Sequence, residues 1–275
     1  MAWLLLIMMP IAYGAGDYLA GQSSKRISPL AVTAVASTVA AAFALVQAAR
    51  ADSLAISMAT LREGAMSGLL LMLANVLFYK ALAIGKAGIV GSIVTLSVLF
   101  SVVADAYRGT LPDTTSLIGI AVILIGVAVI AQPRSLGTMP KSALLLSFGA
   151  AATFGVQYVV LDRASTGNSD MAVVLQYAIA TVVTVIIGLF ARSTGGLNRS
   201  TVGAPVIVGL LFGIGALCLA TSMVETNVAV ATAILMTEPI VLALLGFLFQ
   251  RERLTTVQVA ALLAVIAGAV ATSIG

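Results

Sequence analysis

The chain has 275 residues, of which 61% are hydrophobic and 9% are charged, and its mean hydropathy is +1.15. This balance is far more apolar than that of soluble globular proteins and predicts an integral membrane protein. With no histidine and a single cysteine, Cys218, the composition excludes a disulfide framework, a Cys/His zinc cluster and a histidine-based catalytic triad.

Apolar runs of about 17 to 25 residues have the length that an α-helix needs to cross a bilayer. We predict ten such runs, and therefore an all-α membrane fold. They cover residues 3–20, 29–49, 64–84, 88–106 and 115–131 in the first half, and 142–161, 171–191, 202–224, 228–249 and 257–273 in the second. No basic residue precedes Trp3 and the first run is long for a secretion signal, so we interpret it as a true span.

The longest connection covers residues 132–141 and lies between the fifth and sixth predicted spans. It contains Pro133, Gly137 and Pro140. We therefore predict a first unit at residues 1–132, a linker at 133–141 and a second unit at 142–275. Five spans per unit is an odd number, so the second unit must enter the membrane inverted relative to the first. Inverted repeats are common in alternating-access transporters, and a duplicated scaffold without transport is the alternative.

The two units also have polar residues and glycines at corresponding positions. Asp17–Tyr18 corresponds to Gln157–Tyr158, and Ser97–Val98 falls on Glu238–Pro239. The third and eighth spans each begin with two glycines four residues apart, Gly64/Gly68 and Gly209/Gly213. Small residues at this spacing predict surfaces where helices pack closely.

Three stretches carry a family resemblance: Tyr79-Lys80-Ala81-Leu82 in the first unit, and Thr237-Glu238-Pro239 and Arg251-Glu252-Arg253-Leu254 in the second. Together with Leu111, Gly119 and Gly126, and with Gly268 in the second unit, they resemble two EamA repeats of the drug/metabolite transporter superfamily. The resemblance implies a ten-helix basket around a central cavity, and it leaves the substrate open because these motifs recur in exporters of amino acids, metabolites and drugs. The first repeat departs from the pattern, with Ser97-Val98 in place of Glu-Pro and no loop glutamate in Arg108-Gly109-Thr110.

Glu238 is the only charged residue of the stretch 231–248 and is followed by Pro239. A carboxylate deep in a bilayer costs several kcal/mol by insertion scales. The proline cannot donate a backbone hydrogen bond and frees carbonyls near Leu235 and Met236. Two interpretations stay open: a ligand or proton site at a kink, with Pro239 as the helix pivot, or a glutamate that caps a neighbouring helix or hydrogen-bonds across the bundle.

Polar side chains far from the span ends form the predicted substrate pathway. They are Asp17, Tyr18, Asn75, Tyr79, Lys80, Gln157, Tyr158, Gln176, Tyr177 and Glu238. The tyrosines join an apolar ring to a hydroxyl, which suits amphipathic solutes.

Other polar residues receive simpler interpretations. Asp17 and Lys80 are expected at the same membrane face, where they could form an ion pair that is either a gate or a static lock. We expect Tyr13, Tyr107 and Trp3 in the interfacial belt. Asp162 and Glu225 are expected to be solvated loop charges.

The distribution of Lys and Arg indicates orientation. Leaving out Lys80, the odd-numbered connections hold nine basic residues and the even-numbered ones hold four. The positive-inside rule then places the odd connections in the cytoplasm and both termini outside. The net charge of +4 thus belongs to short loops, so it does not indicate nucleic-acid binding.

We predict a secondary active transporter that exports small organic metabolites (amino acids or related solutes, or drugs) by alternating access, and that works as a monomer in a bacterial-type inner membrane. Its partners would be the solute and the lipid bilayer, with protons as the candidate coupling ion through Glu238 or Asp17. No Gly-x-x-x-x-Gly-Lys-Ser/Thr loop is present, and we expect no metal, no cofactor and no enzymatic activity. The alternative is a membrane scaffold or lipid-handling protein that transports nothing.

Overall fold

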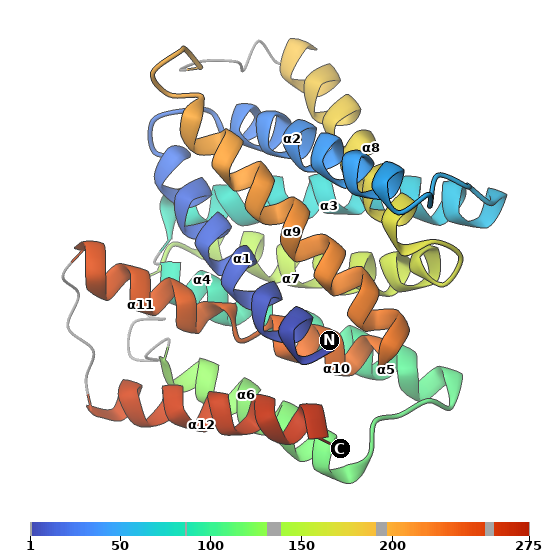
Figure 1. Cartoon of the computed structure of the whole chain (residues 1–275). Coiled ribbons are helices and arrows are strands. Elements are labelled where there is room, and N and C mark those ends of the chain that lie inside the picture. The colour runs from blue at the N-terminus through green and yellow to red at the C-terminus, as the bar shows by residue number, and fades with distance from the viewer. Residues whose placement is uncertain (1, 86, 131–138, 191–196, 251–255, 275) are drawn as a thin grey trace.

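The computed structural model describes residues 2–85, 87–130, 139–190, 197–250 and 256–274. Every regular element in these ranges is a helix (Figure 1). Most of the predicted linker, including Pro133 and Gly137, and the charged cluster 251–253 lie outside the described residues.

Eight of the ten predicted spans are continuous helices. They are α1 (Ala2–Ser23), α2 (Pro29–Arg50), α3 (Met58–Ile84), α6 (Thr114–Ile130), α7 (Lys141–Ser165), α8 (Ser169–Phe190), α9 (Gly203–Glu225) and α12 (Thr256–Ile274). Seven helical segments are long and apolar enough to cross a membrane, and three further apolar segments are shorter. Helix α3 begins six residues before the predicted start because Ser57 caps it, its hydroxyl accepting from the Thr60 N–H at 3.0 Å.

The ninth predicted span is interrupted where its proline indicated. Two residues, Met236 and Thr237, separate α10 (Val228–Leu235) from α11 (Glu238–Gln250). The Thr237 hydroxyl donates to the Ile234 carbonyl at 2.8 Å, which satisfies one backbone acceptor at the break. Pro239 is the second residue of α11, in the first helical turn, where a missing backbone N–H costs nothing.

The fourth predicted span is long and apolar enough to cross a membrane over Ile89–Arg108, but it contains a short 3₁₀ turn that we did not predict. It consists of α4 (Ala87–Val94), a single 3₁₀ turn η1 (Thr95–Ser97) and α5 (Val98–Arg108). No proline marks this break. Instead, the Thr95 hydroxyl donates to the Ser92 carbonyl at 2.7 Å, a local bond that competes with the regular helical pattern. Both breaks therefore lie at the positions that the two halves share, Ser97–Val98 and Glu238–Pro239.

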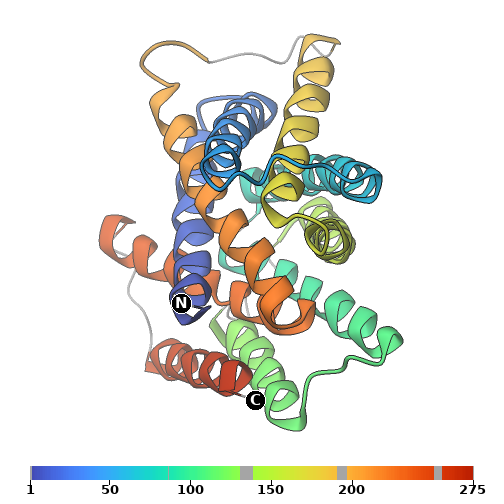
Figure 2. The same ribbon diagram turned by 45° about the vertical axis from the view of Figure 1, so that its right-hand side comes forward.

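The two halves pack against each other, and the third span of each half contacts the first two spans of the other half. Helix α3 packs on α7 and α8, just as α9 packs on α1 and α2. The remaining large contacts join equivalent helices, α2 with α8 and α6 with α12, and the latter pair lies side by side in both ribbon views (Figures 1 and 2). This pairing is what two copies of one unit related by an approximate two-fold axis would produce.

Glycines make the closest of these contacts, as their spacing predicted. A Cβ added at Gly68 would meet the Gln176 carbonyl and lie 2.9 Å from the Ile179 Cβ on α8. Gly209 is its equivalent: a Cβ there would lie 2.5 Å from the Ala36 carbonyl oxygen on α2. The α3–α8 and α9–α2 contacts thus depend on the missing side chain.

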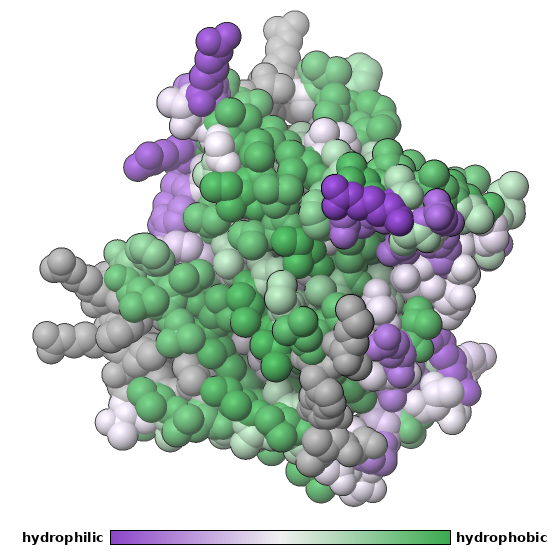
Figure 3. All heavy atoms as spheres, in the orientation of Figure 1, coloured by the Kyte–Doolittle hydropathy of each residue, from purple (hydrophilic) through white to green (hydrophobic). Residues whose placement is uncertain are grey.

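The molecular surface has the distribution expected of a protein in lipid. Figure 3 shows apolar side chains over most of one face, with hydrophilic residues gathered toward two opposite sides. Large apolar side chains such as Leu145, Phe190 and Val103 are more than 60% exposed. Because water would penalise so much exposed apolar area, the chain is a multi-pass membrane protein.

Candidate functional site

A cavity lies between the two halves, beside the break that precedes α11. Seven helices line it, three from the first half and four from the second. The lining residues are Tyr13 and Asp17 of α1; Leu71, Asn75 and Phe78 of α3; Val94 of α4; Phe154, Gln157 and Tyr158 of α7; Tyr177 of α8; Phe212 of α9; and Glu238 of α11. The space open to the centre of a water molecule is about 30 Å³, which is room for about two waters. The lining side chains therefore leave little free space between them.

Two carboxyl groups of the lining lie next to each other. Asp17 and Glu238 are each only 8% exposed, and their side chains contact each other. The break places Glu238 at the first position of α11, where the helix dipole stabilises an anion. The Tyr79 hydroxyl lies 3.5 Å from Asp17 Oδ1 and donates to it. Glu238 thus begins its own helix, contacts Asp17 across the bundle and lines the cavity.

A cluster of buried amides and a hydroxyl holds Gln157 in the cavity wall. Gln157 Nε2 donates to Gln176 Oε1 at 2.6 Å and to the Ser67 hydroxyl at 3.0 Å. That hydroxyl in turn donates to Gln176 Oε1 at 2.7 Å. Both protons of the Gln157 amide are therefore committed, whereas its Oε1 is buried and has no hydrogen-bond partner among the described residues.

Aromatic rings make up half of the lining. Tyr13 packs on Phe212 with ring centroids 5.6 Å apart, and Phe154 is stacked on Tyr158 at 6.0 Å. The interfacial position predicted for Tyr13 was wrong. Tyr13 lies four residues before Asp17, so both side chains project from the same face of α1 into the cavity.

Six of the ten predicted pathway residues line the cavity, namely Asp17, Asn75, Gln157, Tyr158, Tyr177 and Glu238. Tyr79 and Gln176 contact this set from behind. The structure does not bring Tyr18 and Lys80 into it: the Tyr18 ring lies 6.2 Å from that of Phe249.

Lys80 is exposed and belongs to no ion pair of the described residues, so the expected pair with Asp17 is not formed. Successive helical residues point about 100° apart. Since Tyr79 faces Asp17, its neighbour Lys80 points elsewhere.

Sequence reasoning also missed the apolar part of the lining. Leu71, Phe78, Val94, Phe154 and Phe212 are apolar residues within apolar helices. A side chain of this kind is equally suited to lipid, to a helix contact or to a cavity, so the residue type carries no signal.

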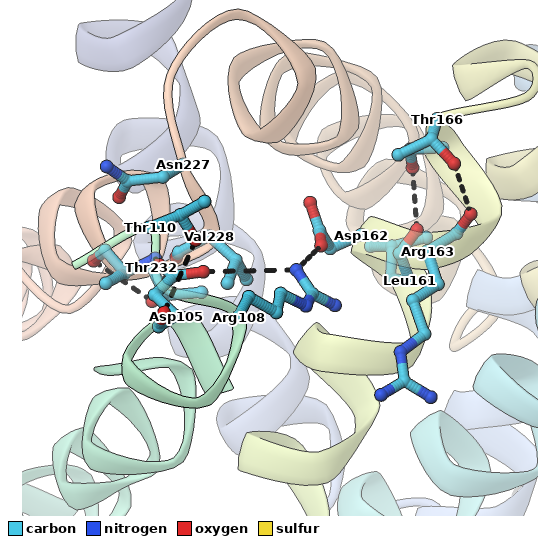
Figure 4. Close-up of polar contacts among 12 residues, drawn as sticks. Asp105, Arg108, Thr110, Leu161, Asp162, Arg163, Thr166, Asn227, Val228 and Thr232 are labelled. Carbon is cyan, nitrogen blue, oxygen red and sulfur yellow. Dashed lines mark hydrogen bonds and ion pairs between the residues drawn. The ribbon is translucent and has the colours of Figure 1, made fainter. Parts of the chain in front are cut away.

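An ion-pair cluster joins the halves at one end of the molecule (Figure 4). Arg108 of α5 lies between two carboxylates, with Nη1 2.5 Å from Asp162 Oδ2 and 3.9 Å from Asp105 Oδ1. Asp105 Oδ2 also accepts from the Ala229 N–H at the start of α10, at 2.8 Å. The prediction that Asp162 is a solvated loop charge was wrong, because it is 6% exposed and paired.

A second set of polar contacts joins the halves at the same end. The Ser53 hydroxyl donates to Asp170 at the start of α8, and Asn168 Nδ2 donates to the Ser53 carbonyl at 2.8 Å. Asn168 and Asp170 follow directly after α7, whose last turns carry Asp162. This end of the structure is therefore closed by contacts between the two halves.

The comparisons with known proteins agree with this architecture. The sequence profile of the EamA-like transporter family matches the chain twice, over residues 1–132 and 141–274. A search of the curated proteins found no match. One crystal structure of another protein is similar to this chain with a TM-score of 0.80 and 17% sequence identity, covering 99% of this chain and 96% of that one. At this identity the likeness concerns the fold alone.

The two profile matches span nearly the whole length, and each covers one set of helices that packs against the other. Among the described residues, no group of three or more Asp, Glu, His or Cys side chains could hold a metal ion. The chain belongs to the EamA-like transporter family and has two EamA repeats.

Proposed function

We propose that this protein is a secondary active transporter that exports small organic solutes by alternating access, with the cavity between its halves as the solute site. In this proposal ten helices span a bacterial-type inner membrane as two inverted repeats, and both termini lie outside. The observation that carries it is a buried cavity lined by both halves that contains two carboxyl groups and lies beside a helix break. A cavity of this composition also favours transport over the alternative of a scaffold, whose centre would need only apolar packing.

Broken helices support a binding role for this region. Many transporters form their sites near the bilayer midplane from discontinuous helices, because half-helix ends present backbone dipoles to the solute or coupling ion. Here α11 starts at Glu238 on the cavity, and the α4 break supplies Val94.

The closed geometry corresponds to an intermediate stage of alternating access. Room for about two waters does not admit an organic solute. Access therefore requires the halves to move apart at one end. At the end that carries Arg108, the contacts that must break include the Arg108–Asp162 pair, the Asp105–Ala229 hydrogen bond and the hydrogen bonds of Ser53 with Asp170 and Asn168.

Asp17 and Glu238 are the candidate proton carriers. Tyrosines such as Tyr13, Tyr79 and Tyr177 surround them, and no lysine or arginine is among the described residues that line the cavity. Two ionised carboxylates in contact repel strongly where water is excluded. A proton or a cationic solute would relieve this repulsion, which couples the charge of the pair to the contents of the cavity.

The direct test measures solute movement by the full-length protein in proteoliposomes. Candidate solutes come first from a thermal-shift screen of purified protein against amino acids, nucleosides and cationic drugs. We expect at least one stabilising solute to be taken up faster than by protein-free liposomes, and an imposed pH gradient to change that rate. A protein that binds solutes but moves none of them in either direction would contradict the proposal.

Replacing Arg108 with glutamine should open the end of the molecule that it closes. The change leaves Asp105 and Asp162 without their cation, which we expect to disfavour the closed arrangement by about 1 to 2 kcal/mol, or roughly 5- to 30-fold in population. A cysteine at the lining position Leu71, in a Cys218→Ser background, reports access to a membrane-impermeant thiol reagent added on that face. We expect faster labelling in Arg108→Gln.

Arg163→Gln is the matched control. Arg163 is an exposed arginine one residue after Asp162, and Figure 4 shows its guanidinium pointing away from the cluster. If both variants label at the parental rate, the cluster is a static contact and not a gate.

A further inference from the structure

The central cavity contains carboxyl and amide oxygens that can accept hydrogen bonds, and one of them has no partner among the described residues. Asp17 and Glu238 contribute carboxyl oxygens. Gln157 contributes an Oε1 that is buried and without a partner among the described residues, while the residue itself is 1% exposed. An unsatisfied buried acceptor costs about 1 to 3 kcal/mol, so it indicates that a donor occupies the cavity at some stage of the cycle.

Several of the hydrogen-bond donors around the cavity are already used. The Tyr79 hydroxyl donates to Asp17, and the Tyr177 hydroxyl lies 3.4 Å from the Phe212 carbonyl and donates to it. Both N–H groups of the Gln157 amide are taken by Ser67 and Gln176. Asn75, Tyr13 and Tyr158 also line the cavity and carry polar hydrogens, but none of them donates to Gln157 Oε1. The free oxygen of Gln157 is thus available to a donor from outside the protein.

The rest of the wall favours a positively charged donor with an apolar body. Six of the twelve lining residues are aromatic, in packed pairs such as Tyr13–Phe212 and Phe154–Tyr158. Aromatic faces attract cations within about 6 Å of the ring centroid, most strongly when water is excluded. No described residue of the lining is basic, so nothing there would neutralise an anionic solute.

We propose that the cavity binds an organic cation, a protonated amine on an aromatic or similarly flat apolar body, with its ammonium group between Asp17, Glu238 and the free Oε1 of Gln157. This proposal names the solute class of the transport site and so rests on the proposed function. The primary ammonium donates hydrogen bonds to the acceptors, and the rings enclose the apolar body.

Four related probes test the charge and the donor separately: phenethylamine, its quaternary trimethylammonium derivative, phenethyl alcohol and phenylacetate. Binding is measured by calorimetry on the full-length protein in lipid nanodiscs, without any need for transport. We expect both cations to bind, the alcohol to bind at least ~10-fold more weakly, and phenylacetate not to bind. An alcohol or an anion that binds as tightly as the amine would overturn the proposal.

Gln157→Met isolates the unpartnered oxygen. Methionine is close in shape to glutamine and removes the acceptor, so the affinity for phenethylamine should fall about 10-fold. The quaternary derivative has no N–H group and should be affected within about twofold. The ratio of the two affinities in one variant does not depend on the fraction of folded protein, so a ratio equal to that of the parent would remove Gln157 from the site.

Asp17→Asn and Gln22→Met complete the set. Asp17→Asn should weaken both cations by at least ~10-fold, because it removes a charge that both probes use. Gln22, on the same helix as Asp17, lies outside this cavity, and Gln22→Met should change neither affinity. Equal affinities in Asp17→Asn and the parent would contradict the proposal.

Different experimental results would contradict this proposal and the transport proposal. If neutral or anionic solutes cross proteoliposomes and the amines do not bind, the solute class is wrong and transport stands. If the amines bind with the expected pattern and nothing crosses, the site stands and the transporter function is wrong.

Discussion

Replacing Glu238 with glutamine is expected to reduce transport driven by a pH gradient to the level of protein-free liposomes, while the protein still folds. Glutamine has nearly the same shape and is neutral at every pH. In the proposed cycle the acidic pair with Asp17 must carry its charge at one stage and lose it at another. A permanently neutral residue cannot make that change, so proton movement down the pH gradient can no longer drive solute transport through this position.

The measurement compares solute movement in proteoliposomes with and without an imposed pH difference. Size-exclusion elution and thermal unfolding establish that the variant is folded. Glu225→Gln is the matched control, because Glu225 ends α9 and is exposed. Undiminished pH-driven transport in Glu238→Gln would remove Glu238 from the coupling mechanism and leave Asp17 as the candidate.

The largest effect on stability is expected from Gly68. Alanine at this position would push its Cβ into the Gln176 carbonyl and against Ile179 of α8. Overpacking of this kind typically costs about 1 to 3 kcal/mol, and leucine should cost more and lower the yield of folded protein. The displaced segment also carries the Gln176 side chain, which holds Gln157 in the cavity wall. We therefore expect Gly68→Ala to weaken solute binding as well as the fold.

Gly188→Ala is the comparison for this substitution. Gly188 lies on α8, and nothing lies within 4 Å of a Cβ built there. Alanine should be neutral or stabilise the helix by up to about 1 kcal/mol. Thermal unfolding of both variants in the same detergent checks the difference, and equal midpoints would show that α3 can move away from α8 without cost.

The break at Pro239 and the buried polar positions were predictable for one physical reason. A backbone group without a hydrogen bond and a polar side chain without a partner are both expensive in hydrocarbon. Residues such as Glu238, Gln157 and Tyr177 therefore indicate a protein interior even before any contact is known. The chain places all three on one cavity.

The errors have an equally definite origin. The 3₁₀ turn at Thr95–Ser97 accompanies a hydroxyl hydrogen bond that an unbroken helix can also accommodate, so the residue types did not reveal the turn. The residue types of Tyr13 and Asp162 are compatible with the membrane–water interface and with a buried contact. Their neighbours on other helices, Phe212 and Arg108, make both positions buried contacts.

By itself, the sequence determined that the chain crosses a membrane as apolar helices, that it consists of two related halves, and that a few polar groups must lie inside. These properties follow from the cost of transferring each residue into hydrocarbon, which depends on residue type and spacing. The tertiary structure alone decided that Asp17 faces Glu238 and Tyr79 instead of Lys80, that five apolar residues share their cavity, and that Arg108 closes one end against Asp162. Those outcomes depend on the rotation and contact of helices distant in the chain, and helices that are apolar on all sides contain no pattern that specifies this rotation.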